Sequence, residues 1–371
     1  MSKKLITIVL GTRPEAIKLA PVFKAIKNSN QFKTRLILTG QHNELVYKVF
    51  RNFNIEPDLD LSVMQNSKTL IDITSEILKG LKNEFNSNPS NLVIVQGDTT
   101  SAFCGALAAF YSNIPVGHVE AGLRTDNLFD PFPEEANRRL ISQIASLHFA
   151  PTQLSLENLE NSNVIGKKYL TGNTVVDSLY FLVNDVPPLK IDSTKINGKK
   201  IILTTIHRRE NWGKNLENII NGIKLSIKSC PNAFFVLPMH PNPIVRKPIK
   251  KAFKNNPSIE LIEPLDYIDM ISAIKASYFV LSDSGGLQEE APALGKPVLI
   301  LRNSTERPEG IQAGTSYLVG TEKENINNFI VKLIKNETFY KKISKAINPY
   351  GDGKASLRIL EIISKFFEKT L

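Results

Sequence analysis

The feature that most constrains the fold is the alternation of short apolar runs with segments of helical periodicity along both halves of the 371-residue chain. Such alternation predicts parallel sheets covered by helices on both faces, and therefore an α/β protein. The predicted strands of the first half are 5–10, 34–38, 92–96, 115–119 and 148–150, and those of the second half are 201–206, 233–238, 259–262, 278–281 and 297–301.

The two halves begin in the same way. Strand 5–10 ends at Gly11-Thr12-Arg13, and strand 201–206 ends at His207-Arg208-Arg209, so each half opens with a strand that has a basic tip. The polar segment 184–200, which contains Pro187-Pro188, reads as a linker. We predict two similar α/β domains, an N-terminal one over 1–183 and a C-terminal one over 201–353, with a final helix over 354–371 that returns to the first domain.

Composition excludes several classes of protein. The formal charge is +10, but the lysines are scattered over helix faces and no dense basic run is interleaved with aromatics, so nucleic-acid binding is disfavoured. No apolar run approaches membrane-spanning length, and 5–10 is too short for a signal sequence. Cys104 and Cys230 stand far apart without metal-ligand spacing. We expect a cytoplasmic protein without a metal.

The segment after strand 278–281, Asp283-Ser284-Gly285-Gly286, is the strongest candidate for a binding site. A strand that turns through glycines into a helix offers free backbone N–H groups and a positive dipole end to a phosphate. Glu289 and Glu290 follow about one turn later and can accept hydrogen bonds from sugar hydroxyls. The alternative is an ordinary junction with Ser284 as N-cap.

Carboxylates follow two strands of the first half and begin a later helix. Asp98 follows 92–96 and is placed as an N-cap, Glu120 follows 115–119, and Glu134 comes after two prolines. An ion pair of Glu134 with Arg138 at i, i+4 is the structural alternative for that helix. Crowded carboxylates are also how an acid–base site obtains perturbed pKa values.

Basic residues occupy comparable places. Arg13 and Lys18 flank the start of the first helix, where Pro14 suits the first position and Pro21 is expected to kink or restart the helix. His207, followed by two arginines at a strand tip, suits a diphosphate. His240 is a weaker candidate, because a lone loop histidine is usually structural.

Seven motifs in order now point to a family. They are GTRPEAIK at 11–18, GDTTS at 97–101, HVEAGLRT at 118–125, PFPEE at 131–135, HRREN at 207–211, DSGGLQEE at 283–290 and TERPE at 305–309. Over nearly its whole length the chain resembles the non-hydrolysing UDP-N-acetylglucosamine 2-epimerases of bacteria.

The resemblance implies a glycosyltransferase-B-like pair of Rossmann-like domains, with the active site in the interdomain cleft and usually a homodimer. It implies an isomerase that interconverts UDP-N-acetylglucosamine and UDP-N-acetylmannosamine without a cofactor and supplies polysaccharide synthesis for the cell envelope. The family's catalytic positions match Asp98, Glu120 and Glu134, assisted by Lys18, Arg138 and His207. Substrate-binding positions match Arg13, Lys18, His207, Ser284, Gly285, Gly286, Glu290 and Arg307, while Met270 stands where phenylalanine is common.

The chemistry explains such an inventory. The proton on sugar C2 becomes acidic only as the C1–O bond to UDP breaks, which leaves a glycal and free UDP in the site. Addition of a proton to the opposite face and return of UDP complete the inversion. The reaction needs a base, an acid and clamps for the leaving diphosphate, but the sequence does not assign a face to each carboxylate.

Many bacterial members of the family also bind a second UDP-N-acetylglucosamine as an activator. Gln41, Arg208 and His240 match that regulatory pocket. Glu44 stands where glutamine is common, and Ser67-Lys68 stand where Arg-Gln is common. We therefore expect weakened or altered activation, because Glu44 would repel a diphosphate and Ser67 cannot replace a bidentate cation.

The main alternative function is a glycosyltransferase that uses a UDP-N-acetylhexosamine donor on the same scaffold, since fold alone does not separate the two. Three carboxylates in the first domain favour proton chemistry at the sugar.

Overall fold

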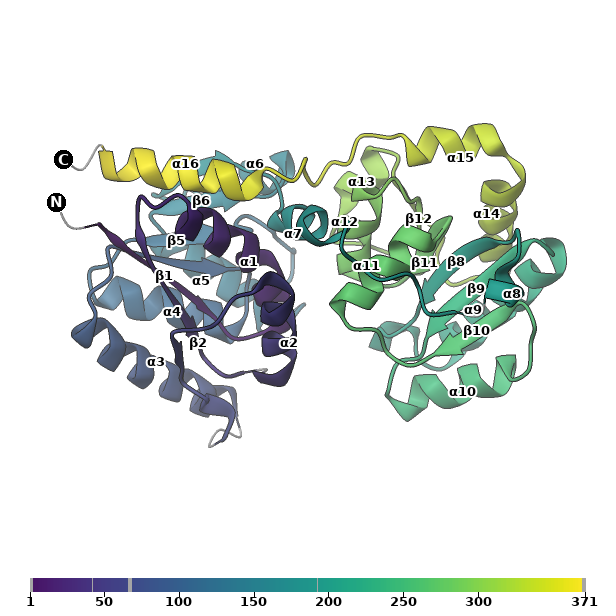
Figure 1. Cartoon of the computed structure of the whole chain (residues 1–371), viewed down its shortest axis with the longest axis horizontal. Helices are drawn as coiled ribbons and strands as arrows, with labels where there is room; N and C mark the ends of the chain where they lie inside the picture. The colour runs from purple at the N-terminus through teal and green to yellow at the C-terminus, as the bar shows by residue number, and fades with distance from the viewer. Residues whose placement is uncertain (1–2, 42, 66–68, 192, 369–371) are drawn as a thin grey trace. The chain divides into compact units, whose positions relative to one another are not determined.

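The computed structural model describes residues 3–41, 43–65, 69–191 and 193–368, and the chain divides by its internal contacts into two units. Unit 1 comprises Met1–Phe181 with Gly351–Leu371, and unit 2 comprises Leu182–Tyr350 (Figure 1). The sequence placed the corresponding boundaries at 183/184 and 353/354. The predicted linker, 184–200, contains the short helix α8 (Ser193–Ile196) and leads directly into strand β8.

Unit 1 is built on a parallel sheet of seven strands in the order β3-β2-β1-β4-β5-β6-β7. The inner strands are almost wholly apolar because both faces of the sheet are covered by helices, and their side chains form the core of the unit. The strands are β1 (Leu5–Leu10), β2 (Lys33–Leu38), β3 (Leu59–Asp60), β4 (Leu92–Gln96), β5 (Val116–Val119), β6 (Leu147–Ala150) and β7 (Lys167–Leu170).

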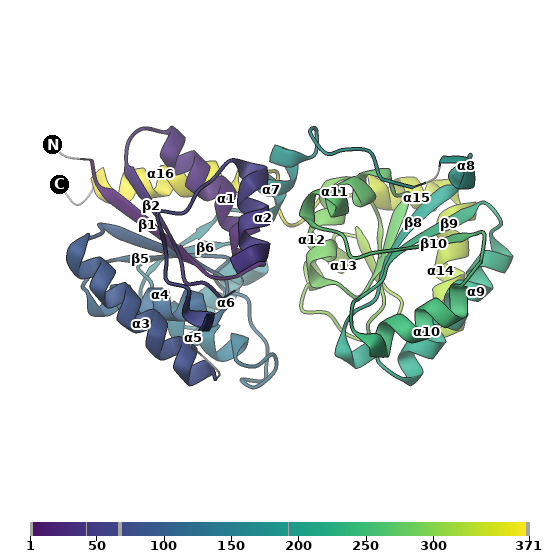
Figure 2. The same cartoon turned by 60° about the horizontal axis from the view of Figure 1, so that its bottom comes forward.

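The helices of unit 1 lie on the two faces of this sheet, and the C-terminal helix α16 packs against α1 (Figures 1 and 2). Helix α4 packs against both α3 and α5. The helices are α1 (Arg13–Asn28), α2 (Asn43–Phe53), η1 (Val63–Gln65), α3 (Leu70–Ser87), α4 (Thr100–Tyr111), α5 (Glu134–Ile144), α6 (Gln153–Asn161), α7 (Thr174–Leu182, whose last residue belongs to unit 2) and α16 (Ala355–Glu368).

Unit 2 repeats this plan with six parallel strands in the order β10-β9-β8-β11-β12-β13. They are β8 (Lys200–Thr205), β9 (Ala233–Pro238), β10 (Ile259–Ile262), β11 (Phe279–Ser282), β12 (Val298–Ile300) and β13 (Ser316–Leu318). The helices are η2 (Arg209–Asn211), α9 (Lys214–Ser229), α10 (Pro243–Phe253), α11 (Tyr267–Ala276), α12 (Gly285–Ala293), α13 (Pro308–Gln312), α14 (Lys323–Lys335) and α15 (Glu337–Ser344). Helices α9 and α14 pack closely on one face.

Both sheets thus have the Rossmann strand order 3-2-1-4-5-6, and unit 1 adds a seventh strand. In each sheet the order reverses between the first and fourth strands, at β1/β4 and at β8/β11. Ligands of open parallel sheets bind beyond the carboxyl ends of the strands at this reversal. The polar motifs of the sequence follow these strands, which is why the fold gathers them.

All ten predicted strands exist, with ends that shift by no more than a residue or two. Three further strands were missed, namely β3, β7 and β13. They are short strands at or near the sheet edges, and partial exposure leaves β3 and β7 without a buried apolar run.

Of the two effects expected at Pro21, a kink or a restart, the restart does not occur, because α1 is continuous from Arg13 to Asn28. A proline inside a helix leaves the carbonyl of residue i−4 without its donor. Here that carbonyl belongs to Ile17, and the buried Ser178 hydroxyl donates a hydrogen bond to it. The side chain from α7 therefore replaces the missing N–H and keeps the helix intact.

Among the described residues, no helix has the length and apolar character needed to cross a membrane.

Candidate functional site

Glu120 is the most constrained carboxylate of unit 1. It follows β5 with a φ of 61°, in the left-handed region that costs a non-glycine residue energy and occurs often at functional sites. Lys18 of α1 forms an ion pair with its Oε1, and the amide of Gln96, the last residue of β4, donates to its Oε2. Only 7% of the Glu120 side chain is exposed, so the structure holds a nearly buried carboxylate in one position.

Asp98 lies on the neighbouring strand end. The predicted N-cap role is wrong, because Thr99 caps α4 and its hydroxyl accepts a hydrogen bond from Ala102 N at 3.0 Å. The Asp98 side chain does not cap α4. Its Oδ2 instead accepts two hydrogen bonds from Arg138, from Nε at 2.8 Å and from Nη2 at 2.7 Å. Asn137 Nδ2 also donates to the Asp98 carbonyl at 2.8 Å. Helix α5 therefore fixes both the backbone and the side chain of Asp98.

Glu134, the first residue of α5, does not form the i, i+4 ion pair with Arg138 that was the structural alternative to a site role. Arg138 is directed to Asp98 and, at i−3, to the fully buried Glu135, whose Oε2 lies 3.2 Å from Arg138 Nη1. Within the described part of the chain, the buried Oε2 atom of Glu134 has no hydrogen-bond partner. A buried carboxylate oxygen without a partner is costly and is expected where a ligand will bind.

Two buried residues that were not predicted as site residues, Glu15 and His118, support the loop that carries Asp98. Glu15 Oε2 accepts hydrogen bonds from Gly11 N at 3.1 Å and Thr12 N at 2.7 Å, and its Oε1 accepts one from Thr99 Oγ1 at 2.8 Å. Burial is the main cause that raises the pKa of Glu15 to about 7. His118 Nε2 lies 2.7 Å from the Gly97 carbonyl, and burial lowers the pKa of His118 to about 4.

The neutral imidazole of His118 therefore donates to the residue before Asp98. A Cβ built on Gly97 would lie 3.4 Å from Glu120 Oε2, so the Asp98 loop passes close to Glu120. The structure brings Asp98, Glu120, Lys18 and Arg138 together at adjacent strand ends. Arg13, at the start of α1, is exposed.

In unit 2 the segment that the sequence predicts to bind an anion forms the start of α12. Ser284 occupies the N-cap position without a side-chain capping bond, so its hydroxyl is not committed to the helix. The Arg307 guanidinium packs against Gly285, where an added Cβ would lie 2.7 Å from Nη1. Arg307 Nε also lies 2.6 Å from Glu289 Oε1. The glycine is required here because it lets the cation approach the helix N-terminus.

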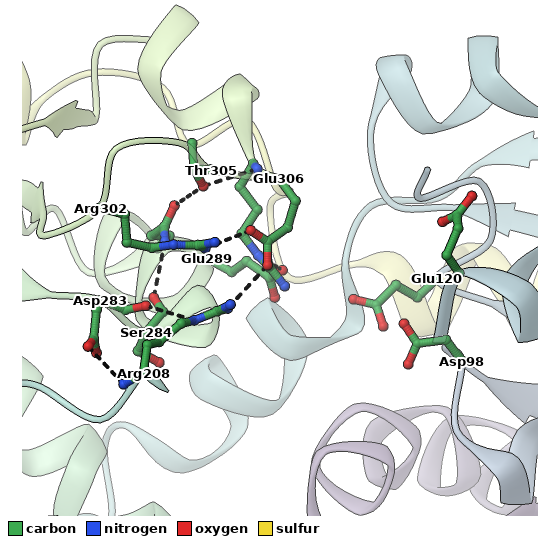
Figure 3. Close-up of polar contacts among 12 residues, drawn as sticks. Asp98, Glu120, Arg208, Asp283, Ser284, Glu289, Arg302, Thr305 and Glu306 are labelled. Carbon is green, nitrogen blue, oxygen red and sulfur yellow. Dashed lines mark hydrogen bonds and ion pairs between the residues drawn. The ribbon is translucent and has the colours of Figure 1, made fainter. Parts of the chain in front are cut away.

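A network of charged side chains surrounds this helix start (Figure 3). Arg302, which is 7% exposed, contacts Glu210 and Glu306 at 2.6 Å each, and Glu306 also contacts Arg208 at 3.1 Å. Burial alone would raise the pKa of Glu306, but the charges of nearby Arg307, Arg208 and Arg302 lower it to about 2. Arg302 could not be identified from local sequence, because its partner Glu210 comes from a distant segment.

Asp283 is a second carboxylate that the sequence analysis did not assign. It is fully buried after β11, and its Oδ1 lies 2.9 Å from His207 Nδ1. Burial opposes its charge, but the hydrogen bond and charge of His207 and the backbone N–H groups lower the pKa of Asp283 below its usual value. His207 in turn stacks on His240, with ring centroids 6.3 Å apart.

The remaining predicted residues occupy separate positions. Glu290 lies beside the buried Tyr267, whose pKa is raised well above the usual value by burial first and by Glu290 second. Met270 packs against the apolar cluster of unit 2 on α11. Gln41 accepts a hydrogen bond from Ser101 Oγ at 2.9 Å, and Glu44 is exposed beside Lys48. Ser67 and Lys68 lie outside the described residues.

In the described ranges, no group of three or more His, Cys, Asp or Glu side chains is arranged to hold a metal ion.

Comparison with known proteins points to the same family as the sequence motifs. A family model described as UDP-N-acetylglucosamine 2-epimerase matches residues 24–364. The chain is 47% identical over 375 residues to the UDP-N-acetylglucosamine 2-epimerase of Campylobacter jejuni, with 98% of each chain covered.

Solved structures agree over the whole chain. A crystal structure of a putative UDP-N-acetylglucosamine 2-epimerase from Listeria monocytogenes has a TM-score of 0.93 at 41% identity and covers 100% of this chain and 98% of that one. The enzyme of Neisseria meningitidis, solved bound to UDP-GlcNAc, has a TM-score of 0.87 at 44% identity and covers 98% and 100%.

The paired Rossmann-like units and these neighbours define an enzyme of the glycosyltransferase-B-like fold class. Within that class, the chain belongs to the UDP-N-acetylglucosamine 2-epimerase family, which is a family of isomerases.

Proposed function

We propose that the protein interconverts UDP-N-acetylglucosamine and UDP-N-acetylmannosamine by elimination and re-addition of UDP, with exchange of the proton at C2. Family membership supports the overall reaction. The arrangement of charged groups in each unit supports the division of labour described below.

Asp98, Glu120 and Glu134 of unit 1 are proposed to move the C2 proton. Carboxylates that lie close together repel one another unless cations balance them. Arg138 and Lys18 balance Asp98 and Glu120 respectively, while one oxygen of Glu134 has no partner within the described ranges. The set can therefore supply one group that accepts a proton and another that donates one.

Unit 2 is proposed to hold UDP. When the C1–O bond breaks, its electron pair passes to the diphosphate, and negative charge grows there. The N-terminus of α12, with Ser284 and Gly285, and the Arg307 guanidinium lie together and stabilise such a charge. His207 is proposed to meet the same diphosphate, and Glu290 the sugar hydroxyls of UDP. Arg13, Gly286 and Met270 are proposed to add binding contacts.

The observation that carries this proposal is the pairing of Asp98 with Arg138 and of Glu120 with Lys18 at neighbouring strand ends. The test is to incubate purified protein with UDP-N-acetylglucosamine alone and to follow the sugar by NMR. We expect UDP-N-acetylmannosamine to accumulate to a constant ratio. A glycosyltransferase would leave the donor unchanged until an acceptor is added, and that result would overturn the proposal.

We further propose that a second UDP-N-acetylglucosamine acts only as a weak activator. Arg208, a proposed contact for it, is already engaged with Glu306, and Glu44 on α2 carries a charge that repels a diphosphate. A reaction started from pure UDP-N-acetylmannosamine should therefore show little lag. A pronounced lag abolished by traces of UDP-N-acetylglucosamine would contradict this proposal.

We also propose a homodimer through α3, α4 and α5 of unit 1. These neighbouring helices expose large apolar side chains, with Ile71 80%, Tyr111 72% and Phe110 and Leu140 50% exposed. A second copy of the same surface would bury them. Light scattering should give twice the chain mass, and Ile71→Asp together with Tyr111→Glu should give the monomer. A wild-type monomer at micromolar concentration would exclude the dimer.

Finally, we propose that the enzyme acts in the cytoplasm and supplies envelope polysaccharide synthesis. Cys104 and Cys230 are both free and buried, as suits a reducing compartment. Cell fractionation tests the location.

A further inference from the structure

The buried carboxylate of Asp283 has partners on both of its oxygens. Its Oδ2 accepts hydrogen bonds from His207 N at 3.0 Å, Arg208 N at 2.9 Å and Asn211 Nδ2 at 3.0 Å. These bonds hold the backbone that follows β8. The other oxygen, Oδ1, accepts a longer hydrogen bond from His207 N at 3.2 Å and faces the imidazole of His207, whose Nδ1 lies 2.9 Å away.

The chemistry of this contact fixes the tautomer of the ring. An ionised carboxylate only accepts hydrogen bonds, so the atom that faces Oδ1 must be a donor. His207 therefore carries its proton on Nδ1, and Nε2 is the nitrogen left for a ligand. When the ring takes a second proton, Nε2–H becomes a donor to an anion while Nδ1–H stays on Asp283.

The surroundings reinforce this orientation. Asp283 is fully buried, whereas 40% of the His207 side chain is exposed, so one end of the pair is fixed and the other is accessible. The ring of His240 stacks on His207 with an interplanar angle of 24°, which restricts rotation of the imidazole. Arg208, which also reaches the Asp283 carbonyl through Nε at 3.2 Å, is directed away to Glu306.

We propose that Asp283 is a positioning residue of the reaction, which holds His207 through Nδ1–H so that Nε2, once it is protonated, donates a hydrogen bond to the leaving diphosphate. The inference rests on the proposed function for its kinetic consequence. The tautomer itself is a property of the protein and is measurable without any turnover.

The first experiment is nitrogen-15 NMR of the full-length wild-type protein labelled at its five histidines. The His207→Gln variant identifies the His207 signals by their loss. We expect a protonated Nδ1 in the free protein, and both nitrogens protonated with UDP bound. An Nε2–H tautomer in the free protein would overturn the proposal, whether or not the protein proves to be an epimerase.

The second experiment is a double-mutant cycle between Asp283→Asn and His207→Gln, measured as kcat for the epimerase reaction. Groups that orient a functional histidine typically change activity by about 10- to 100-fold when altered. We expect Asp283→Asn to lower kcat by that factor in the wild-type background and by less than about threefold when His207 is already glutamine. Equal losses in both backgrounds would show that Asp283 only supports the loop, and would overturn the proposal.

Asp177 provides a matched control. It is also a buried aspartate that holds a helix start, because it accepts hydrogen bonds from Ala355 N at 3.2 Å and from Ser356 N at 2.7 Å. It lies in neither proposed site. Asp177→Asn should lower the free energy of unfolding and leave kcat within about twofold of wild type. If Asp283→Asn fails to fold, the NMR measurement on the wild-type protein decides the proposal alone.

Discussion

Arg138 holds Asp98 by two nitrogens on one carboxylate oxygen, at 2.7 and 2.8 Å, from a helix that begins 36 residues farther along the chain. The contact joins the end of β4 to α5 and places a cation beside a proposed catalytic carboxylate. The pairing of Asp98 with Arg138 could not be predicted from residue type or spacing, because the i, i+4 rule predicts a pair between Arg138 and Glu134.

Arg138→Lys should therefore lower turnover about 10- to 100-fold, because a point charge cannot reproduce the paired donors of the guanidinium. The neighbouring Arg139 is the matched control, as it contacts Glu135 at 2.8 Å and is half exposed. Arg139→Lys should cost less than about threefold. Initial rates with UDP-N-acetylglucosamine test both, and equal losses would contradict the role given to Arg138.

Substitution of Gly285 should weaken UDP binding. Alanine there would place Cβ 2.7 Å from Arg307 Nη1 and 2.9 Å from Cζ, so the guanidinium must move. An alanine at Gly286 meets nothing closer than Ser284 Oγ at 4.0 Å. We expect Gly285→Ala to raise the Kd for UDP about tenfold or more and Gly286→Ala to raise it less, as measured by calorimetry. The reverse order would show that Arg307 does not serve UDP.

Acid should destabilise unit 1 through its buried histidines. Burial lowers the pKa of His118 to about 4 and that of His148 to about 3, against 6.5 in an exposed chain. As pH falls below 6.5, these two histidines bind protons in the unfolded chain but stay neutral in the folded protein, so the free energy of unfolding declines. The slope is up to roughly 1.4 kcal/mol per pH unit for each histidine.

Urea titrations between pH 7 and pH 4.5 measure this slope. His148→Gln, which stays neutral at every pH, should give a shallower dependence than wild type whatever its stability at pH 7. An unchanged slope in this variant would contradict the assignment of His148 as a neutral buried ring.

Glu15 should act in the opposite sense. Burial raises its pKa to about 7 from the ordinary 4.5, so the folded state keeps a proton that the unfolded chain releases. Its contribution to stability is complete below pH 4.5 and is lost as pH rises through about 7. Glu15→Gln should therefore flatten the dependence of unfolding free energy on pH between 5 and 8. A variant that keeps the wild-type decline would show that Glu15 is ionised when folded.

Much of the fold was predictable because the buried strands carry strong local signals. Strands such as β1 and β9 are uninterrupted apolar runs, and their ends were predicted without error. Strand β7 was missed because its Lys167 and Lys168 and its partial exposure leave no such run. Helix α1 was expected to kink or restart at Pro21. The Ser178 hydroxyl that compensates for the proline lies 161 residues away from Ile17 in the sequence, so no local pattern indicates it.

The residues of the candidate site likewise fall into those that the sequence predicts and those that it does not. Residues that follow strands, such as Asp98, Glu120 and Ser284, could be found because the fold class places strand ends at ligands. The partners that orient them could not. Gln96 looks like the end of an apolar strand, and Arg302 lies outside every motif, yet each holds a charged group of the site. Such contacts depend on tertiary packing, which no local pattern encodes.

The most direct test of the account is to run the reaction in deuterium oxide with UDP-N-acetylglucosamine and no acceptor. We predict solvent deuterium at C2 of both UDP-N-acetylglucosamine and UDP-N-acetylmannosamine. Asp98→Asn, Glu120→Gln and Glu134→Gln should each lower its incorporation about 100-fold while UDP still binds. Epimer formed without deuterium at C2, or near-normal incorporation in all three variants, would contradict proton transfer by these carboxylates.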